Sequence, residues 1–314
     1  MQQKIKVLIV CSGNSGYISP FILEQADSLR KKEISIDFFL IKGKGGLGYF
    51  KNYIALIKKI KFFKPNIIHA HYGFSGMLAV LQRKVPVIIT FHGSDINENA
   101  KNLFISKIAE RMASFSVFVN TKLVAKLKPS KSFEVISCGV DLEQNVYLDK
   151  KESRLKLGLD PEKKIILFSS NFLNSIKNYP LAKKAIDLIN NVELIEMKGY
   201  NRKEITLLMN ACDGLLVTSL SESGPLVVKE AMACGCPVVS TDVGDVESVI
   251  GGIKGCYITS FDPIDVAEKL NKIINANIRI NGRERIINLG LDIDRVATNI
   301  INVYLGVLNK KKLY

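Results

Sequence analysis

The chain has 314 residues, of which 47% are hydrophobic and 24% are charged, and this composition is typical of a globular protein with room for two cores. No apolar run reaches the roughly 20 residues that a helix needs to cross a bilayer, and the N-terminal residues lack the pattern of a signal peptide. The six cysteines are scattered, and none of their spacings is typical of a zinc site. We therefore expect a cytoplasmic protein with reduced cysteines and no bound metal.

The net charge is +14, and it is unevenly distributed along the chain. Residues 1–150 contribute +11 of it, and no carboxylate occurs between Asp37 and Asp95. Such asymmetry favours an anionic partner for the first half, either a nucleic acid or a membrane surface. Because no nucleic-acid-binding motif accompanies the charge, we expect no nucleic acid as a partner.

The first half of the chain alternates strands with helices, which is typical of a parallel sheet. Its predicted strands are Lys6–Val10, Ile34–Ile41, a segment within 65–73, Val85–Thr90, Phe115–Asn120 and Glu134–Ile136. A loop of small residues at 11–16 follows the first strand and leads to a helix at about 20–31. All three histidines, His69, His71 and His92, lie at or just past strand ends, on the edge where such sheets bind ligands. This clustering favours a functional role, although no spacing supports a zinc site.

The segment from Gly48 to Lys64 combines an apolar stripe at helical spacing with several basic residues. The stripe comprises Tyr49, Phe50, Tyr53, Ile54, Ile57, Ile60 and Phe63, and the basic residues are Lys51, Lys58, Lys59, Lys61 and Lys64. Two interpretations stay open. The segment is either a helix packed on the sheet with a solvated basic face, or a basic aromatic face that contacts anionic lipid headgroups.

The second half contains a strand–helix–strand unit. The strand Gly214–Thr218 is followed by a turn, and Pro225 suits the first position of a helix because its missing N–H is not needed there. Gly235 can end this helix in a left-handed conformation, and Pro237 prevents it from continuing. In a parallel sheet such a helix begins at the ligand-binding edge, where its free N–H groups favour an anion.

Two carboxylates flank this predicted anion site, with Glu222 in the turn and Glu230 inside the helix. Carboxylates accept hydrogen bonds from hydroxyls, so the combination of phosphate site and acids suits a nucleotide sugar. Upstream, a strand at 164–170 leads through a loop to a helix that begins at about Lys177, where a lysine adds a point charge for phosphate. The alternative is that both glutamates are solvated surface residues.

The stretch from Glu222 to Asp245, ESGPLVVKEAMACGCPVVSTDVGD, closely resembles the donor-site signature of family 4 glycosyltransferases, which have the GT-B fold. The stretches IIHAHYGFSG, TFHGSD and SCGVD resemble the same family. The resemblance implies an α/β protein of two doubly wound, Rossmann-like domains that face each other across a cleft. It implies an acceptor-side domain at 1–150, a donor-nucleotide-binding domain at 151–294, and a C-terminal helix at 295–314 that crosses back to the first domain. The stretch at about 142–160 is charged and poorly periodic, so we expect it to be the linker.

The resemblance also implies roles for individual residues. His92 and Glu222 are expected to act in the transfer step, His92 over the donor sugar and Glu222 on the sugar hydroxyls. The expected contacts to the nucleotide are Gly16, Asn171, Lys177, Tyr200, Gly224, Leu226 and Glu230. Glu230 is expected to hold the ribose and Tyr200 the base. The other five residues are expected to surround the diphosphate.

One position departs from the family pattern. Phe172 stands where the family usually carries an arginine, so a charge and two hydrogen bonds to phosphate are lost. Three interpretations stay open: donor binding is weaker, a neighbouring polar group such as Asn171 replaces part of that contact, or the replacement marks a subgroup of the family.

We therefore expect a retaining, metal-independent glycosyltransferase of the hexosyltransferase type. It would move a sugar from a nucleoside diphosphate sugar, UDP- or GDP-linked, to an acceptor hydroxyl, with no cofactor beyond this donor. The expected setting is surface-polysaccharide or glycolipid synthesis, with a glycan or lipid-linked acceptor and a peripheral position on the inner face of the cell membrane. Two alternatives stay open: a nucleotide-sugar 2-epimerase of the same architecture, and a non-catalytic, membrane-bound scaffold with a decayed donor site.

Overall fold

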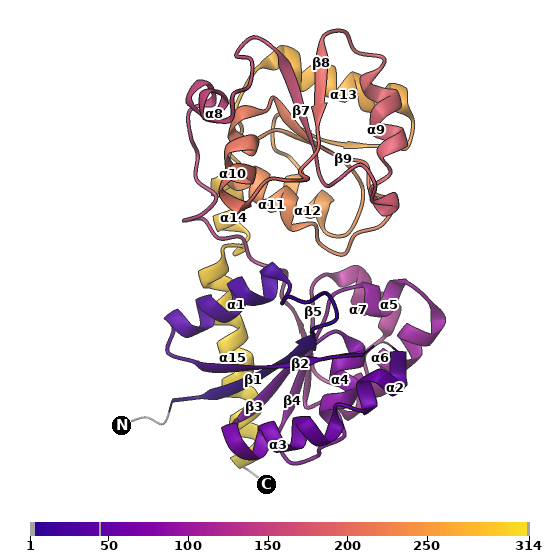
Figure 1. The fold of residues 1–314 in the computed structure, drawn as a ribbon, viewed down its shortest axis with the longest axis vertical. Coiled ribbons are helices and arrows are strands. Elements are labelled where there is room, and N and C mark those ends of the chain that lie inside the picture. The colour runs from indigo at the N-terminus through magenta and orange to yellow at the C-terminus, as the bar shows by residue number, and fades with distance from the viewer. Residues whose placement is uncertain (1–3, 44, 313–314) are drawn as a thin grey trace. The chain divides into compact units, whose positions relative to one another are not determined.

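The computed structural model describes residues 4–43 and 45–312, which divide into two α/β units (Figure 1). Unit 1 consists of Met1–Cys138 together with Ile293–Tyr314, and unit 2 consists of Gly139–Asp292. Residues 1–3 and 313–314 of the domains predicted from the sequence lie outside the described residues. Each unit contains its own parallel sheet.

The sheet of unit 1 has six strands in the order β2-β1-β3-β4-β5-β6, and every pairing is parallel. The strands are β1 (Lys6–Ser12), β2 (Ser35–Ile41), β3 (Ile67–His71), β4 (Val87–Phe91), β5 (Phe115–Phe118) and β6 (Phe133–Val135). The helices are α1 (Pro20–Lys31), α2 (Gly45–Phe50), α3 (Tyr53–Phe63), α4 (Gly73–Val80), α5 (Ser94–Asn97), α6 (Ala100–Met112), α7 (Thr121–Leu127) and α15 (Ile293–Lys312).

Helices cover both faces of this sheet, and alternate residues of β1 show how. Val7 and Ile9 pack against α1 and α15, whereas Leu8 and Val10 pack against α3, α4, α6 and α7. Successive side chains of a strand point to opposite faces, so a strand buried on both faces is apolar throughout. The continuous apolar run of β1 is therefore a consequence of its central place in the sheet.

The sheet of unit 2 has five parallel strands in the order β11-β10-β9-β7-β8. The strands are β7 (Lys164–Phe168), β8 (Val192–Ile195), β9 (Gly214–Val217), β10 (Val238–Thr241) and β11 (Cys256–Thr259). The helices are α8 (Lys150–Leu157), the 3₁₀ turn η1 (Ser175–Lys177), α9 (Tyr179–Ile186), α10 (Arg202–Ala211), α11 (Leu226–Ala233), α12 (Val246–Ile250), α13 (Pro263–Ala276) and α14 (Gly282–Asn288). Here α9 and α13 share one core, and α10, α11, α12 and α14 share the other.

Each sheet changes direction once at a topological switch point. In unit 1 the chain runs from β1 outward to β2 and returns to add β3 on the other side of β1. In unit 2 it runs from β7 outward to β8 and returns to add β9 on the other side of β7. Open parallel sheets bind ligands beyond the carboxyl ends of the strands at such points. The fold therefore predicts ligand-binding sites at the loops after β1 and β3 in unit 1, and after β7 and β9 in unit 2.

The segment predicted as a linker at 142–160 is an ordered part of unit 2. It contains α8, whose N-cap is Asp149 and whose C-cap is Gly158. The side chain of Asp149 accepts the N–H of Glu152, and Gly158 has a left-handed conformation. Arg154 of α8 is buried, donates to the carbonyl of Ala211, and pairs with Asp213 at 3.2 Å. The charged composition that predicted a linker thus belongs to a helix fixed by buried hydrogen bonds.

The single helix predicted over residues 48–64 is broken into α2 and α3. Asn52 lies at the break, and its amide nitrogen donates to the carbonyls of Lys42 at 2.8 Å and Gly48 at 2.7 Å. The predicted stripe is divided as a result: Tyr53 packs against the core, whereas Phe50 is 62% exposed.

The C-terminal helix packs within unit 1 and begins at Ile293, two residues before its predicted start. Its residues Val296, Ile300 and Tyr304 are buried beside α1 and β1. The lysines at 310–312 belong to the end of α15. Among the helices of the described residues, none combines the length and apolar character that crossing a bilayer requires.

Candidate functional site

Side-chain and backbone hydrogen bonds join the loops after β7 and β9 of unit 2. The hydroxyl of Thr218, directly after β9, donates to the carbonyls of Lys177 at 2.8 Å and Asn178 at 3.1 Å. The N–H of Leu220 donates to the carbonyl of Ile176 at 2.8 Å. The 3₁₀ turn that carries Lys177 is therefore fixed at the switch point by the segment that follows β9.

Lys177 and Glu222, both predicted from the sequence to contact the donor, meet at this point. The Nζ of Lys177 forms an ion pair with Oε1 of Glu222. The hydroxyl of Ser219 donates to the same oxygen at 2.9 Å. Both charged side chains are about four-fifths buried, with 17% and 18% of their surface exposed. This arrangement places a cation and a carboxylate side by side at the edge where the fold binds ligands.

Helix α11 begins beside this pair, and a loop from further along the chain packs against its first turn. Pro225 is the N-cap rather than the first helical residue. A Cβ atom on Gly224 would lie 3.3 Å from the carboxylate oxygens of Asp245, and one on Gly244 would lie 2.7 Å from the backbone of Ser223. Gly244 also has a φ of +59°, a conformation that glycine adopts without strain. The two glycines let the loop and the helix start approach backbone to backbone.

A buried ion pair fixes that loop to the helix. Lys229 of α11 is 1% exposed, and its Nζ lies 2.8 Å from Oδ2 of Asp245. The carboxylate therefore bridges the helix and the turn at Gly224, which precedes the helix start. We did not predict this pair from the sequence.

Glu230, the next residue of α11, faces a different cation. Its Oε1 accepts a hydrogen bond from Arg202, at the start of α10, at 2.6 Å. Burial raises the pKa of Glu230 above its ordinary value, and the charge of Arg202 and its hydrogen bond oppose this rise. Tyr200, predicted to contact the base, is partly buried and packs against the same core as α10. The described structure thus brings Glu230 and Arg202 together, as it does Lys177 and Glu222.

Phe172, which replaces an expected arginine, is part of an aromatic cluster. Its ring centroid lies 4.1 Å from that of Tyr179 and 5.5 Å from that of Phe168. The side-chain oxygen of the neighbouring Asn171 accepts the N–H of Leu173 at 3.1 Å, within its own turn. Position 172 therefore contributes packing of α9 against β7, and its ring supplies no charge.

In unit 1, the loop after β1 is tied to the loop after β2. The side chain of Asn14 accepts the N–H of Gly43 at 2.8 Å and donates to its carbonyl at 3.0 Å. The N–H of Gly13 donates to the carbonyl of Ile41 at 2.8 Å. Gly16, predicted to approach the diphosphate, has a φ of +83° and is exposed. A loop of this kind leaves its backbone accessible to a ligand.

The three histidines form a ladder of rings at the carboxyl ends of β3 and β4. His69 is buried between Tyr304 of α15 and Thr90 of β4, with hydrogen bonds of 2.7 Å to each hydroxyl. His71 stacks on His69, and its Nδ1 lies 2.9 Å from Nε2 of His92. One of these two nitrogens donates and the other accepts, so the ring that accepts is neutral in this pair. No group of three or more histidine, cysteine or carboxylate side chains among the described residues is suited to hold a metal ion.

Asp95 organises the backbone around the last histidine. It is buried, and its carboxylate accepts the N–H groups of Gly93 at 2.7 Å, Gly73 at 3.0 Å and His92 at 3.4 Å. Burial raises the pKa of Asp95 to about 6, and these backbone hydrogen bonds oppose the rise. Tyr72, before Gly73, has a φ of +72°, and its ring centroid lies 4.7 Å from that of His92. Strained backbone of this kind is concentrated at functional sites.

A pocket of about 380 Å³ opens beside these residues within unit 1. Its lining combines aromatic side chains with polar ones: Ser12, Asn14, Gly45, Tyr49, Tyr72, Phe74, Ser94, Asp95, Glu98 and Asn102. Aromatic surfaces with a few converging polar groups are typical of small-molecule sites. The pocket lies at the switch point of unit 1, as the fold predicts.

Both units match models of known protein families. Residues 2–144 match the model of Glycosyltransferase Family 4, and residues 164–276 match the model of Glycosyl transferases group 1. The chain belongs to the family 4 glycosyltransferases.

Curated relatives of this glycosyltransferase carry related names. It is 29% identical over 236 residues to an uncharacterized glycosyltransferase of Methanocaldococcus jannaschii, covering 67% of this chain and 66% of the relative. It is 28% identical over 219 residues to TuaC of Bacillus subtilis, a putative teichuronic acid biosynthesis glycosyltransferase, covering 60% of this chain and 56% of the relative. The matches thus span between about half and two thirds of these relatives' length.

Solved structures confirm that this glycosyltransferase has the GT-B fold. Sucrose-phosphate synthase from Thermosynechococcus elongatus superposes with a TM-score of 0.86 at 16% identity, covering 98% of this chain and 100% of the other. Anabaena HepE in complex with UDP superposes with a TM-score of 0.76 at 16% identity, covering 96% and 100%. The prediction of two doubly wound parallel α/β domains is therefore confirmed.

The sequence of this glycosyltransferase did not reveal every charged residue at the site. Lys229 and Asp245 both lie inside the recognised signature, but their pairing depends on how the loop folds back onto α11. Ser219 and Arg202 lie outside it. The one signal in the sequence for a buried ion pair was the position of Lys229, which lies between two buried residues of a short helix.

We predict that the Lys229–Asp245 pair stabilises unit 2. Lys229→Met keeps the length of the side chain but leaves the Asp245 carboxylate without its buried ammonium partner, so the free energy of unfolding should fall by about 3–5 kcal/mol. Chemical denaturation measures this change. The double variant Lys229→Met/Asp245→Asn should recover part of the loss. A single variant as stable as the wild type would contradict the prediction.

We predict that unit 1 loses stability in mild acid through its histidines. Burial lowers the pKa of His69 from 6.5 to about 4 and that of His92 to about 3, and it also lowers the pKa of His71. The unfolded chain therefore binds more protons than the folded chain below pH 6.5, so stability falls as the pH is lowered from 6.5 towards 4. For His69 alone the loss is about 3 kcal/mol. Asp95 acts in the opposite direction between its ordinary pKa and about 6, and offsets part of this loss.

Urea denaturation at a series of pH values between 7 and 4 tests this sign. The variant His69→Gln keeps polar groups near Tyr304 and Thr90 but cannot titrate, so its stability should depend less steeply on pH. A steeper dependence in the variant, or a wild type that gains stability in this range, would show that the histidines are not buried as neutral rings.

Proposed function

We propose that this protein transfers a glycosyl group from a nucleoside diphosphate sugar to an acceptor hydroxyl, with retention of anomeric configuration and without a metal ion. Unit 2 binds the donor nucleotide, and unit 1 binds the acceptor. Glu222 holds hydroxyls of the donor sugar, Glu230 the ribose and Tyr200 the base. Lys177, the amides near Gly224 and Leu226, Asn171 and the loop of Gly16 contact the diphosphate. His92 contacts the donor sugar.

The observation that carries the proposal is the meeting of Lys177 and Glu222 at the switch point of unit 2. A lysine beside the start of α11 offers positive charge for a diphosphate, and the neighbouring carboxylate offers an acceptor for hydroxyls. Negative charge develops on the leaving diphosphate during transfer, so fixed cationic groups at that point lower the barrier. The ion pair keeps both groups in position before the donor arrives.

The donor is most simply a UDP-sugar, with a GDP-sugar as the second candidate. HepE of Anabaena, which shares the fold, has been solved with UDP and with UDP-glucose. The pocket of unit 1 suits a glycan acceptor, because Tyr49, Tyr72 and Phe74 offer flat apolar faces and Glu98 and Asn102 offer hydrogen bonds. The relative from Bacillus subtilis, named for teichuronic acid biosynthesis, supports a role in surface-polysaccharide or glycolipid synthesis.

A membrane surface is the partner that we propose for α2 and α3. Leu47, Phe50, Ile54 and Phe62 of this segment are exposed by 82%, 62%, 69% and 85%. Lys58 and Lys61 are exposed on α3 and Lys51 in the turn that precedes it, whereas Lys59 pairs with Asp37 at 2.5 Å. Apolar side chains beside lysines on an exposed helical segment suit the interface of an anionic bilayer. This contact would hold the enzyme peripherally on the inner face of the membrane, near a lipid-linked acceptor.

We predict that Glu222→Ala lowers transfer by about 100-fold, because the variant loses charged hydrogen bonds to the sugar hydroxyls and the partner of Lys177. The measurement is transfer from a panel of UDP- and GDP-sugars to glycan and lipid-linked acceptors, with folding checked by thermal unfolding. Glu268→Gln, an exposed carboxylate on α13 of the same unit, is the matched control and should retain full activity. Normal turnover by Glu222→Ala would contradict the donor assignment.

The same assay separates the alternatives. Conversion of the nucleotide sugar to its epimer in the absence of any acceptor would indicate a 2-epimerase. A protein that is stabilised by no nucleotide in the thermal assay would instead be a scaffold, since a bound ligand raises apparent stability.

We predict that Lys58→Glu/Lys61→Glu weakens binding to anionic vesicles by more than tenfold, because each basic residue near such a surface contributes about 1 kcal/mol. Sedimentation with vesicles that contain phosphatidylglycerol measures this effect. Lys183→Glu/Lys184→Glu, a reversal of the same size on α9 of unit 2, serves as the control and should bind as the wild type does. Equal loss in both variants would indicate that overall charge, rather than this face, governs binding.

A further inference from the structure

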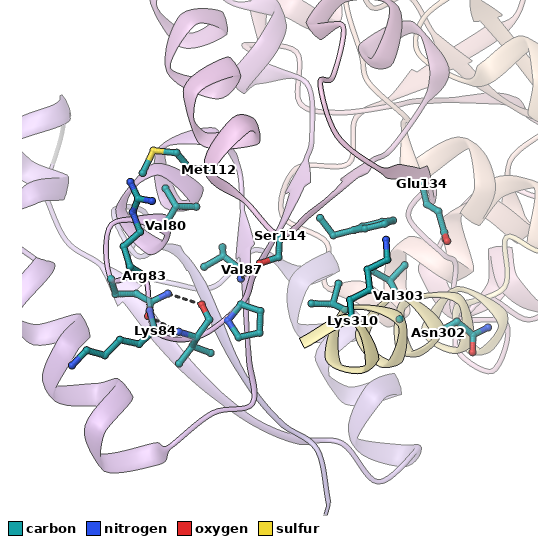
Figure 2. Close-up of a pocket in the computed structure, with 16 residues that line it drawn as sticks. Val80, Arg83, Lys84, Val87, Met112, Ser114, Glu134, Asn302, Val303 and Lys310 are labelled. Carbon is teal, nitrogen blue, oxygen red and sulfur yellow. Dashed lines mark hydrogen bonds between the residues drawn. The ribbon is translucent and has the colours of Figure 1, made fainter. Parts of the chain in front are cut away.

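A second pocket of unit 1 lies away from the histidines, at the amino ends of β4 and β5 (Figure 2). Its volume is about 470 Å³, and it opens between the second half of α15 and the residues that lead into these two strands. Parallel strands place their amino ends at the edge opposite their carboxyl ends, so this pocket is separate from the candidate site of the same unit. A volume of this size is sufficient for a small ligand.

Apolar side chains form most of the pocket lining, together with the polar residues Gln82, Ser114 and Asn302. Its walls include Val85, Val87, Met112 and Phe115 from the sheet side and Val303 and Val307 from α15. Gly306 lies between the last two, and a Cβ atom built on it would meet no other atom within 4 Å. Glycine is unfavourable inside a helix, and here its missing side chain leaves the space open. The pocket is therefore suited to a hydrocarbon chain.

The rim of the pocket is basic. Arg83, Lys84 and Lys310 line it, whereas Glu134 is its single acidic residue. Figure 2 shows Arg83 beside Met112 on one side and Lys310 rising from α15 on the other. Neither Arg83 nor Lys310 forms an ion pair with any residue that the structure describes. Two exposed cations beside an apolar interior complement a ligand with an anionic head and an apolar tail.

The loop that carries Arg83 is fixed in an unusual conformation. Arg83 has a φ of +59°, which is strained for a residue with a side chain. The buried side chain of Gln82 maintains the turn: its oxygen accepts the N–H groups of Lys84 and Val85 at 2.9 Å each, and its nitrogen donates to the carbonyl of Val85 at 2.7 Å. This buried hydrogen-bond network therefore holds Arg83 in its left-handed conformation at the edge of the pocket.

We propose that this pocket binds a lipid phosphate, with the chain inserted beside Gly306 and the phosphate between Arg83 and Lys310. The charge of the rim selects the head group, and the apolar walls supply affinity through the burial of methylene groups. The proposal does not depend on the glycosyltransferase activity, because no residue of the pocket belongs to the candidate site.

Calorimetric titration of the full chain with dodecyl phosphate, below its micelle concentration, tests the proposal. Decyl phosphate should bind more weakly, by up to about fourfold for each methylene removed. Dodecyl maltoside, which has the same chain and a neutral head, should bind at least tenfold more weakly than dodecyl phosphate. Inorganic phosphate, which has no chain, should not bind detectably.

Two substitutions at one position separate filling of the pocket from disturbance of the helix. Gly306→Phe places a ring in the open space and should abolish binding of dodecyl phosphate. Gly306→Ala also adds a side chain to the helix but leaves most of the space, and should retain binding. Arg83→Glu/Lys310→Glu should weaken dodecyl phosphate at least tenfold and leave dodecyl maltoside unchanged.

Binding that persists in Gly306→Phe would overturn the proposal, since the amphiphile would then occupy another surface such as the face of α2 and α3. Equal affinity for dodecyl phosphate and dodecyl maltoside would also overturn it, because the rim would then have no role. Lys58→Glu/Lys61→Glu should bind dodecyl phosphate as tightly as the wild type, and a loss in that variant would assign the binding to the α2–α3 face instead.

Discussion

Parallel pairing brings the carboxyl ends of all strands of a sheet to one edge, and this constraint determines where both units carry their functional groups. In unit 1 the carboxyl ends of β1, β3 and β4 meet at that edge: Gly16 lies in the loop after β1, His71 ends β3, and His92 directly follows β4. In unit 2 the loops after β7 and β9 contribute Lys177 and Glu222. These residues are distant in sequence, and the sheet order alone is sufficient to assemble each set.

Buried charge is the second constraint, because each buried ion needs a partner of opposite charge. Helix α11 has only eight residues, yet two consecutive positions in it are charged and buried. Lys229 is paired with Asp245 and Glu230 with Arg202, so the two residues fix α11 to two different segments. The start of the helix is thereby held in place relative to both the loop at 243–245 and the start of α10. A helix start that is to bind an anion benefits from such rigidity, because preorganised N–H groups need no rearrangement when charge develops.

Much of this architecture could be predicted from the sequence, because its signals are local. Pro225, Gly235 and Pro237 mark the ends of α11 within a few residues of their observed positions, and Gly235 has the expected left-handed conformation with a φ of +69°. Strand residues such as those of β1 are apolar because both faces are buried. The position of Lys177 beside the sheet edge also follows from the order of strand and helix.

What could not be predicted depends on contacts between distant segments. Asn52 breaks the helix at 48–64 through a bond to Lys42, and nothing in the periodicity of that segment indicates it. The charged stretch around Arg154 was interpreted as a linker because its partner, Asp213, lies 59 residues away. The pocket at Gly306 could not be predicted for the same reason, because α15 and the start of β4 are more than 200 residues apart in the sequence. A single glycine in a helix does not predict a pocket unless the residues that face it in the fold are known.

The replacement at position 172 shows how the two constraints combine at the proposed donor site. Phe172 packs against Tyr179 of α9 at the position where the resemblance predicts a cation. Lys177 is then the cation at the carboxyl end of β7, and its ammonium is already engaged by Glu222. A diphosphate alone would have to compete with that carboxylate for the lysine, whereas a complete nucleotide sugar offers its hydroxyls to Glu222 and its phosphate to Lys177 together. If the protein has the proposed function, the ion pair therefore favours the intact donor over a bare nucleotide. The site would then gain selectivity for the nucleotide sugar, although it lacks the positive charge expected at position 172.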